Sequence, residues 1–444
     1  MFYVEIEKPV RVSSHRMDMR DKPGSRGSVH MLSCDACDSD ASALVSCHYT
    51  SLHSEERMLW TVVVLMGCAV ISVAQIPKYN ESCVRGTYPP SPEKKVKTYV
   101  VNLDLPPEQR WTHVVEDKAV QIRNILAEFK KYALDWSPKA QGVIDWVDKN
   151  FPTFDKTLPY PFPGEMTGIS KASGLKLGEV VLYNLFYEFF TVCTSIVAED
   201  PTGKLFHARN LDFGLFLGWD IKNNTWDISE FLRPLIVNIE YTRGGKTLFK
   251  GVHFAGYVGI LTAVKPTLFT LSMDERFNAD GGFIGIMEWV LGDHSGSWMG
   301  FLTRRVMENA TSYEEARDWL TQTEMLAPAY FILGGNQSGE ACVITRAREK
   351  TLDVWPMASA GGWYILETNY DHWEKPMVLD DRRTPANKCM RKLTKQNVSV
   401  SGLFDVLSSI PVLNKLTTYT AVMQVDSGHL ETWIQYCKDP CFPW

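Results

Sequence analysis

One cysteine in this sequence has neighbours that favour a role as a nucleophile. A strand-length run starts at Cys193, and a second one spans 205–210. Between them, Asp200-Pro201-Thr202-Gly203 places Pro at the second and Gly at the fourth position of a type I turn. We therefore predict a β-hairpin with residue 193 opposite roughly residue 210. This pairing brings Arg209 and Asp212 back beside Cys193, so that a thiol, a fixed positive charge and a carboxylate converge.

Cleavage of the Val192-Cys193 bond would give Cys193 a free α-amino group. That amine has a reference pKa of about 7.7 to 8, against about 8.5 for the thiol, so it can serve as the thiol's own base. The alternative is a structural cysteine buried in a core hairpin. Arg209 and Asp212 favour the catalytic interpretation, and we expect the Arg209 charge to favour the thiolate.

Two later stretches have side chains that suit the same chemistry. Asn369 follows a predicted strand, and its amide N–H is the kind of donor that an oxyanion hole needs. Arg382 comes after a short loop, and its planar guanidinium can hold a carboxylate. We expect both at strand ends facing Cys193. Asp274-Glu275-Arg276-Phe277 is ambiguous, with a solvated loop as the alternative.

The composition excludes some functions. The 444 residues are 45% hydrophobic and carry a formal net charge of -6, which leaves no basic surface for nucleic acid. Cys34 and Cys37, with Cys47-His48 nearby, do not assemble four ligands at zinc-finger spacing. We therefore predict no nucleic-acid partner, no metal site and no cofactor.

The chain divides into four predicted parts. Residues 1–57 lack a sustained apolar period and are expected to be an unstructured extension, with Met58 as the working start. Residues 58–74 resemble a signal peptide that ends in small-x-small before Gln75. Residues 75–192 are predicted to be mainly helical, and 193–444 to form the catalytic part.

The strand and helix patterns predict an α+β fold. Strand-like runs cover 235–241, 246–250, 330–333, 342–346, 362–368 and 417–425, and helices are expected at 283–291, 298–309 and 313–322. Runs of strands with grouped helices indicate stacked sheets flanked by helices.

Cysteines and sequons indicate the secretory pathway. Apart from Cys193, five cysteines after the signal segment are disulfide candidates, with Cys437 and Cys441 plausible as a local loop: Cys83, Cys342, Cys389, Cys437 and Cys441. Five Asn-x-Ser/Thr sequons are candidate glycosylation sites, at Asn80, Asn223, Asn309, Asn336 and Asn397.

From Gln75 to Trp444 the sequence resembles the acid ceramidase family within the cysteine N-terminal nucleophile hydrolases. The resemblance rests on a specific set of segments: Cys193 to Asp200, Arg209 to Gly214, Glu275-Arg276-Phe277, 327–340, Thr368 to Asp371 and Asp381 to Pro385. It implies an αββα fold of stacked antiparallel sheets and a lysosomal amidase, with a secreted fraction, that hydrolyses ceramide.

The resemblance also implies a role for each matching residue. Cys193 would be the nucleophile, with Arg209 and Asp212 beside it. Glu275 and Asn369 would help to bind the amide and its oxyanion, and Arg382 would order the site. A cut at Val192-Cys193 would give α and β subunits joined by a Cys83–Cys389 disulfide, with a second disulfide from Cys437 to Cys441.

Further implied partners are ceramide and related N-acyl lipids, a saposin-type activator, and the lysosomal membrane as a peripheral contact. The competing enzyme is an N-acylethanolamine acid amidase, which shares the catalytic set. A non-catalytic secreted lipid carrier is a remote alternative, because it has no need to place Arg209 and Asp212 beside Cys193.

Overall fold

The computed structural model describes residues 33–35, 46–48, 83–136, 149, 157–186, 191–213, 218–276 and 295–441. The chain divides into two compact units, Met1–Gln75 and Ile76–Trp444. In the first unit, the described residues form a short antiparallel pair, β1 (Ser33–Asp35) and β2 (Ser46–His48), with Cys34 opposite Cys47. The rest of the predicted extension, the predicted signal peptide and the predicted helix at 283–291 lie outside the described residues.

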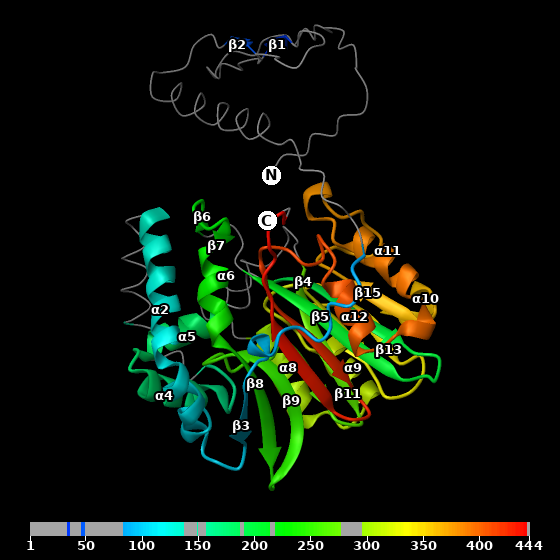
Figure 1. Ribbon diagram of the computed structural model, residues 1–444. Coiled ribbons are helices and arrows are strands. Elements are labelled where there is room, and N and C mark those ends of the chain that lie inside the picture. The colour runs from blue at the N-terminus through cyan, green and yellow to red at the C-terminus, as the bar shows by residue number, and fades with distance from the viewer. Residues whose placement is uncertain are drawn as a thin grey trace, which may run out of the picture. The chain divides into compact units, whose positions relative to one another are not determined.

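Two large β-sheets form the centre of the second unit (Figure 1). The larger has the spatial order β14 (Thr351–Pro356), β13 (Ala341–Arg346), β12 (Ala329–Gly334), β11 (Phe269–Glu275), β10 (Thr262–Lys265), β9 (Lys246–Phe254), β8 (Ile236–Arg243), β3 (Thr98–Asn102). The smaller has the order β15 (Tyr364–Glu367), β4 (Thr191–Glu199), β5 (Leu205–Phe213), β16 (Thr417–Gln424), β17 (His429–Ile434). Neighbouring strands are antiparallel except β3 and β8. Strands β6 (Trp219–Asp220) and β7 (Thr225–Trp226) pair with each other as a separate two-stranded ribbon.

Helices cover the outer faces of both sheets. The smaller sheet is covered by α11 (Arg383–Leu393) and α12 (Val400–Leu407), and the larger by α8 (Met299–Asn309) and α9 (Tyr313–Gln322). The predicted αββα layering is thus confirmed. The remaining helices are α2 (Thr112–Trp136), α4 (Phe162–Ser173), α5 (Leu177–Phe186), α6 (Asp227–Leu232) and α10 (Met357–Ala360).

The sequence explains the two-faced packing of the central hairpin. Along β4 and β5, Ile196, Ala198 and Ala208 pack against α11 and α12. Val197 and Leu205 point the other way and pack against β12 and β13 of the facing sheet. Because successive side chains on a strand point to opposite faces, both faces of this hairpin are buried. Its polar residues are therefore held in a water-poor interior.

In the described part of 75–192, the helices α2, α4 and α5 are accompanied by strand β3, and β4 begins at Thr191. Helix α9 is capped at its N-terminus, because Ser312 Oγ accepts a hydrogen bond from the Glu315 main-chain N–H (3.1 Å). Among the described residues, no helix is long and apolar enough to cross a membrane.

Candidate active site

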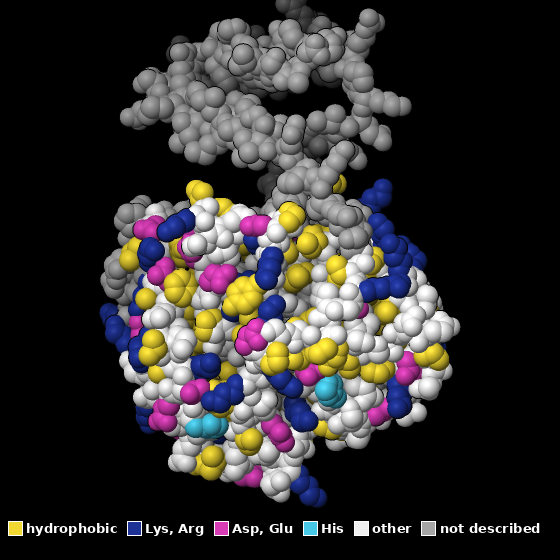
Figure 2. Space-filling model, viewed as in Figure 1, with side chains coloured by type: hydrophobic (Ala, Val, Ile, Leu, Met, Phe, Trp, Pro, Cys, Tyr) yellow, Lys and Arg dark blue, Asp and Glu magenta, His cyan; other side chains and the backbone are white. Residues whose placement is uncertain are grey.

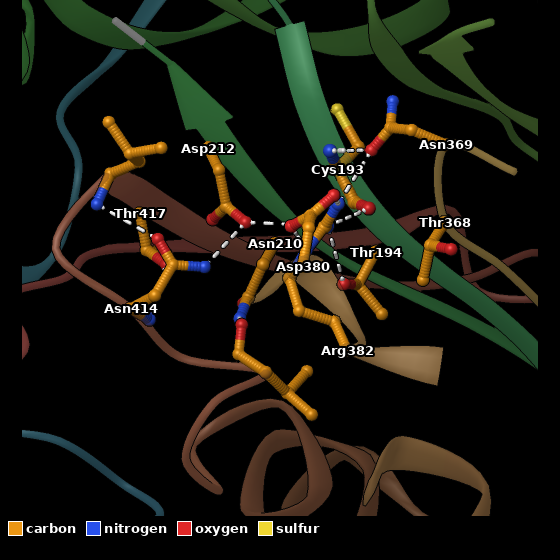
Figure 3. A network of polar contacts seen from close by, with 12 residues as sticks. Cys193, Thr194, Asn210, Asp212, Thr368, Asn369, Asp380, Arg382, Asn414 and Thr417 are labelled. Carbon is orange, nitrogen blue, oxygen red and sulfur yellow. Dashed lines mark hydrogen bonds and ion pairs between the residues drawn. The ribbon is translucent and has the colours of Figure 1, made fainter. Parts of the chain in front are cut away.

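Cys193 lies near the start of β4, at the end of the sandwich where β5, β11 and β15 finish. The Cys193 side chain is fully buried. Its main-chain N–H donates to Asn369 Oδ1 at 2.8 Å, and its main-chain carbonyl accepts from Arg382 Nη1. Figure 3 shows Asn369 and Arg382, both from the chain after β15, reaching Cys193 on β4. The uncut peptide at Cys193 is therefore fixed on both sides.

Arg209 is the cation that contacts the sulfur. The hairpin is confirmed, with a register one residue from that predicted: Cys193 pairs with Leu211, and Arg209 with Ser195. Cys193 and Arg209 consequently share the face that looks toward the larger sheet. Arg209 Nη2 donates to Cys193 Sγ, while its Nη1 donates to Leu261 O (2.5 Å) and Thr262 Oγ1 (3.1 Å).

Asp212 lies on the opposite face of the same strand pair, opposite Val192. Its Oδ2 accepts from Asn414 Nδ2 at 2.9 Å and is 3.6 Å from Arg382 Nη1. Asp212 thus stands beside the bond predicted to be cut, on the side away from the sulfur. Burial raises the pKa of Asp212 to about 6, although the Arg382 charge acts in the opposite direction.

Arg382 connects the two faces. Besides the Cys193 carbonyl, it reaches Thr194 Oγ1 at 3.2 Å and Asn369 Oδ1 at 2.8 Å. Asp380 accepts from its Nε at 2.9 Å and balances its charge. The prediction that Arg382 sits at a strand end was wrong, because it is the residue before α11.

Asn369 follows β15 and is held from both ends of its amide. Its Oδ1 faces Cys193 and Arg382, and its Nδ2 donates to the main-chain oxygen of Glu275 at 2.7 Å. The predicted residue Glu275 thus meets the site through its main chain. The segment after β15 is further anchored by Asp371, which accepts from Arg276 Nε and from Tyr330 OH, each at 2.7 Å.

Sequence reasoning did not single out Asp274 or Ser195 as members of the site. Asp274, at the end of β11, is fully buried, and its Oδ1 lies 3.3 Å from Arg209 Nη2 and accepts from Ser195 Oγ at 2.9 Å. Burial raises the pKa of this carboxyl more strongly than the nearby Cys193 side chain lowers it. The available signal was the alternation of β4, which places Ser195 on the same face as Cys193.

In the uncut chain the Arg209 charge lowers the pKa of Cys193, as expected, but it is not the largest effect. Burial raises the pKa of Cys193 well above its usual value, and the Arg209 charge does not offset this effect. The carboxylates of Asp274 and Asp212 raise it further. The sulfur is therefore kept as a thiol while the chain is intact.

Disulfides and sequons lie apart from the catalytic cluster. Cys83 pairs with Cys389, and Cys437 with Cys441, as the resemblance implied. Cys342, the fifth candidate, is a free buried thiol, because it lies inside the core on β13. The sequon residues Asn223, Asn309, Asn336 and Asn397 are exposed, whereas Asn80 lies outside the described residues.

The sequence was compared with protein families and with known proteins. Residues 193–435 match the model of the linear amide C-N hydrolases, choloylglycine hydrolase family. Acid ceramidase from Bos taurus is 50% identical over 389 residues, which are 86% of this chain and 98% of that protein. Acid ceramidase from Homo sapiens is also 50% identical, over 87% of this chain and 99% of that one. This chain belongs to the choloylglycine hydrolase family of linear amide C-N hydrolases.

Two further similarities involve N-acylethanolamine-hydrolyzing acid amidases. Residues 94–158 match the beta subunit of N-acylethanolamine-hydrolyzing acid amidase. The solved structure of the Caenorhabditis elegans N-acylethanolamine-hydrolyzing acid amidase ortholog is 31% identical, with a TM-score of 0.47, and covers 55% of this chain and 100% of that chain. The main family match begins at Cys193 itself, the first residue of the predicted catalytic part.

Proposed function

We propose that this chain hydrolyses the amide bond of ceramide, releasing sphingosine and a fatty acid, after it has cut itself between Val192 and Cys193. One observation carries the proposal: Arg209, Asn369 and Arg382 hold the sulfur, the main-chain N–H and the carbonyl of Cys193, respectively. That arrangement serves a cysteine whose own backbone takes part in the reaction. The identity to acid ceramidases over almost their whole length supports the substrate.

Self-cleavage starts with attack of the Cys193 sulfur on the Val192 carbonyl carbon. A carbon–sulfur bond forms, the Val192-Cys193 carbon–nitrogen bond breaks, and the nitrogen takes the proton that the thiol gives up. Water then hydrolyses the thioester and leaves a carboxylate on Val192 and a free thiol and α-amine on Cys193. Asp212 is placed to receive or return a proton at the cut peptide.

The mature site would repeat this chemistry on a lipid amide. The sulfur attacks the acyl carbonyl, the α-amine of Cys193 takes the thiol proton, and the same proton is returned to the leaving sphingosine amine. In the uncut chain the Asn369 Nδ2 donates to the main-chain oxygen of Glu275, and its second N–H is proposed to donate to the oxyanion that forms. Water then releases the fatty acid from the thioester.

The two fragments are proposed to remain one α/β protein. Cys83 lies before the cut and Cys389 after it, and the disulfide between them spans the cleavage site. The family match at 94–158 falls in the proposed α subunit, and the match at 193–435 in the proposed β subunit. The exposed sequons support passage through the secretory pathway to the lysosome, with a secreted fraction.

A substrate that stays in a membrane needs an enzyme that reaches the lipid surface. Between β15 and α11, a loop leading to Arg382 exposes Trp373, Met377, Val378 and Leu379, and Val378 is 81% exposed. Lys and Arg gather over the neighbouring helix α11, at the upper right of Figure 2. An apolar tip beside basic side chains favours contact with an anionic lipid surface.

The loop yields a first prediction. Replacing Trp373 and Val378 together by Ser should lower binding to vesicles of phosphatidylcholine and phosphatidylserine by about thirtyfold or more, because each large apolar side chain gains roughly 1 kcal/mol or more on burial in lipid. Co-sedimentation of the mature protein measures this. Val120→Ser on α2, also an exposed apolar position, should bind as well as the wild type.

Equal vesicle binding by the loop variant and the wild type would remove the loop from the membrane contact. Loss that appears only when a saposin is present would assign the loop to that activator.

The runner-up activity is hydrolysis of N-acylethanolamines, which the match at 94–158 favours.

A direct competition tests the substrate. With equal ceramide and N-palmitoylethanolamine in detergent, ceramide should turn over faster by about tenfold or more, as expected where a pocket selects apolar bulk. We expect the optimum at acidic pH, because protonation of Asp and Glu removes repulsion between a chain of charge -6 and anionic lipid. Faster turnover of the ethanolamide, or an optimum above neutrality, would reject the assignment.

A further inference from the structure

The inner face of the hairpin holds one more ionisable group than the proposed reaction uses. Asp274 contacts Arg209 and Ser195 and lies near Cys193, and both of its oxygens are buried. Only its Oδ1 has a hydrogen-bond partner among the described residues; its Oδ2 has none. An ionised carboxylate with a half-satisfied hydrogen-bonding capacity is costly to bury. Its position at the nucleophile therefore calls for a role in the reaction.

The number of positive and negative charges around Arg209 indicates the role of Asp274. The Arg209 guanidinium is shared between the Cys193 sulfur and Asp274 Oδ1. In a buried site one cation can balance one anion, and a second anion has no partner. With Asp274 ionised, Arg209 is already neutralised, and a Cys193 thiolate would be the surplus anion.

We propose that Asp274 limits the reactivity of Cys193 near neutral pH, because its carboxylate competes with the Cys193 thiolate for the charge of Arg209. The inference rests on Cys193 being the nucleophile of self-cleavage. Formation of the thiolate then requires that Asp274 holds a proton. The state with a neutral Asp274 and a thiolate has the same number of protons as the state with a carboxylate and a thiol, so raising the pH cannot enrich it.

Near pH 6 the neighbouring groups leave Asp274 as the titrating group of the inner face, and Glu367 titrates two pH units higher. His207 on β5, linked through Ser272 and Ser195, is neutral, since burial lowers its pKa to about 3. Burial raises the pKa of Tyr419 on β16 to about 12 and that of Glu367 on β15 to about 8, so both are uncharged near pH 6. Tyr330, opposite Asp274 on β12, is likewise uncharged because burial raises its pKa.

Arg382 and Asp212 lie on the other face of the hairpin and also act on the charge of Cys193, and Arg382 acts on that of Asp274 as well. The Arg382 charge is balanced by Asp380 and faces Asp212. Burial raises the pKa of Asp274 to about 6, the same value as for Asp212. The test therefore compares a variant with the wild type at each pH, so that the titration of Asp212, present in both, cancels.

The experiment measures self-cleavage of the purified uncut chain from pH 5 to pH 8, for the wild type and Asp274→Asn. Asparagine keeps the shape of the side chain but carries no charge, so Arg209 is left for the thiolate. Below about pH 6 the two rates should agree within about twofold. Above it, the ratio of variant to wild type should rise by about tenfold per pH unit, because only the variant continues to gain thiolate.

Ser195→Ala is the matched control. It removes the 2.9 Å hydrogen bond to Asp274 but leaves the carboxylate, so its rate should keep a constant ratio to that of the wild type above pH 6. A pH-independent ratio for Asp274→Asn, whether above or below one, would overturn the proposal and leave Asp274 a structural role. Failure of the proposed nucleophile gives a different result, namely cleavage in Cys193→Ala.

Discussion

Replacing Cys193 by alanine should abolish both self-cleavage and amide hydrolysis. One sulfur attacks the Val192 carbonyl in the uncut chain and the lipid amide in the mature protein, and no other described thiol lies near the cluster. The loss should be complete in each step, because Asn369 and Arg382, which hold the main-chain N–H and carbonyl of residue 193, cannot form the thioester. A time course on reducing gels and a ceramide assay measure the two steps.

Cys342→Ala provides a matched control for this experiment. Cys342 is also a free and fully enclosed thiol, but it lies on β13 in the core. We expect its replacement to lower the free energy of unfolding by about 1 kcal/mol while self-cleavage proceeds normally. Two fragments of normal size from Cys193→Ala would refute the N-terminal nucleophile mechanism.

Asp212→Asn should slow both steps by roughly 10² to 10⁴, the range associated with loss of a general acid or base. Asp212 pairs in register with Val192, whose peptide bond to Cys193 has the nitrogen that must gain a proton in the first step and becomes the α-amine in the second. Asparagine preserves the shape of the side chain and can still accept the hydrogen bond from Asn414, but it cannot accept and return a proton. Rates per mole of folded chain, measured at pH 5 and pH 7, test this.

The stability of the Asp212→Asn variant shows whether slower rates come from lost proton transfer or from unfolding. Burial raises the pKa of Asp212 to about 6 from a usual value of 3.8, so the folded chain binds the proton more tightly than the unfolded chain. Ionisation of Asp212 therefore destabilises the fold as the pH rises from 3.8 through 6, and asparagine avoids that cost. The variant should be at least as stable as the wild type at pH 7.

Asp405→Asn, on α12, should leave both rates unchanged, because the Asp405 carboxylate accepts from the main-chain N–H groups of Gly86 (2.9 Å) and Thr87 (2.8 Å) and from the Thr87 hydroxyl, and not from any residue of the catalytic cluster. A fully active and fully processed Asp212→Asn chain would exclude Asp212 from the reaction.

The sequence by itself determined the central hairpin and the group of side chains that meets there. Apolar alternation around Asp200-Pro201-Thr202-Gly203 predicts two strands and a turn, and these are local properties that neighbouring residues encode. The hairpin alone brings Arg209 to Cys193, since 16 residues separate them. Asn369 and Arg382 were recognised by residue type and by the family resemblance.

Only the tertiary structure decided which face each group occupies and what charge the sulfur carries. A shift of one residue in register moves a side chain to the other face, and the observed register puts Arg209 with Cys193 and Asp212 behind them. Asp274 reaches the cluster from the facing sheet, 79 residues beyond Ser195 in the chain. Sheet stacking also removes water from the cluster. Burial therefore outweighs the Arg209 charge and keeps Cys193 a thiol in the uncut chain.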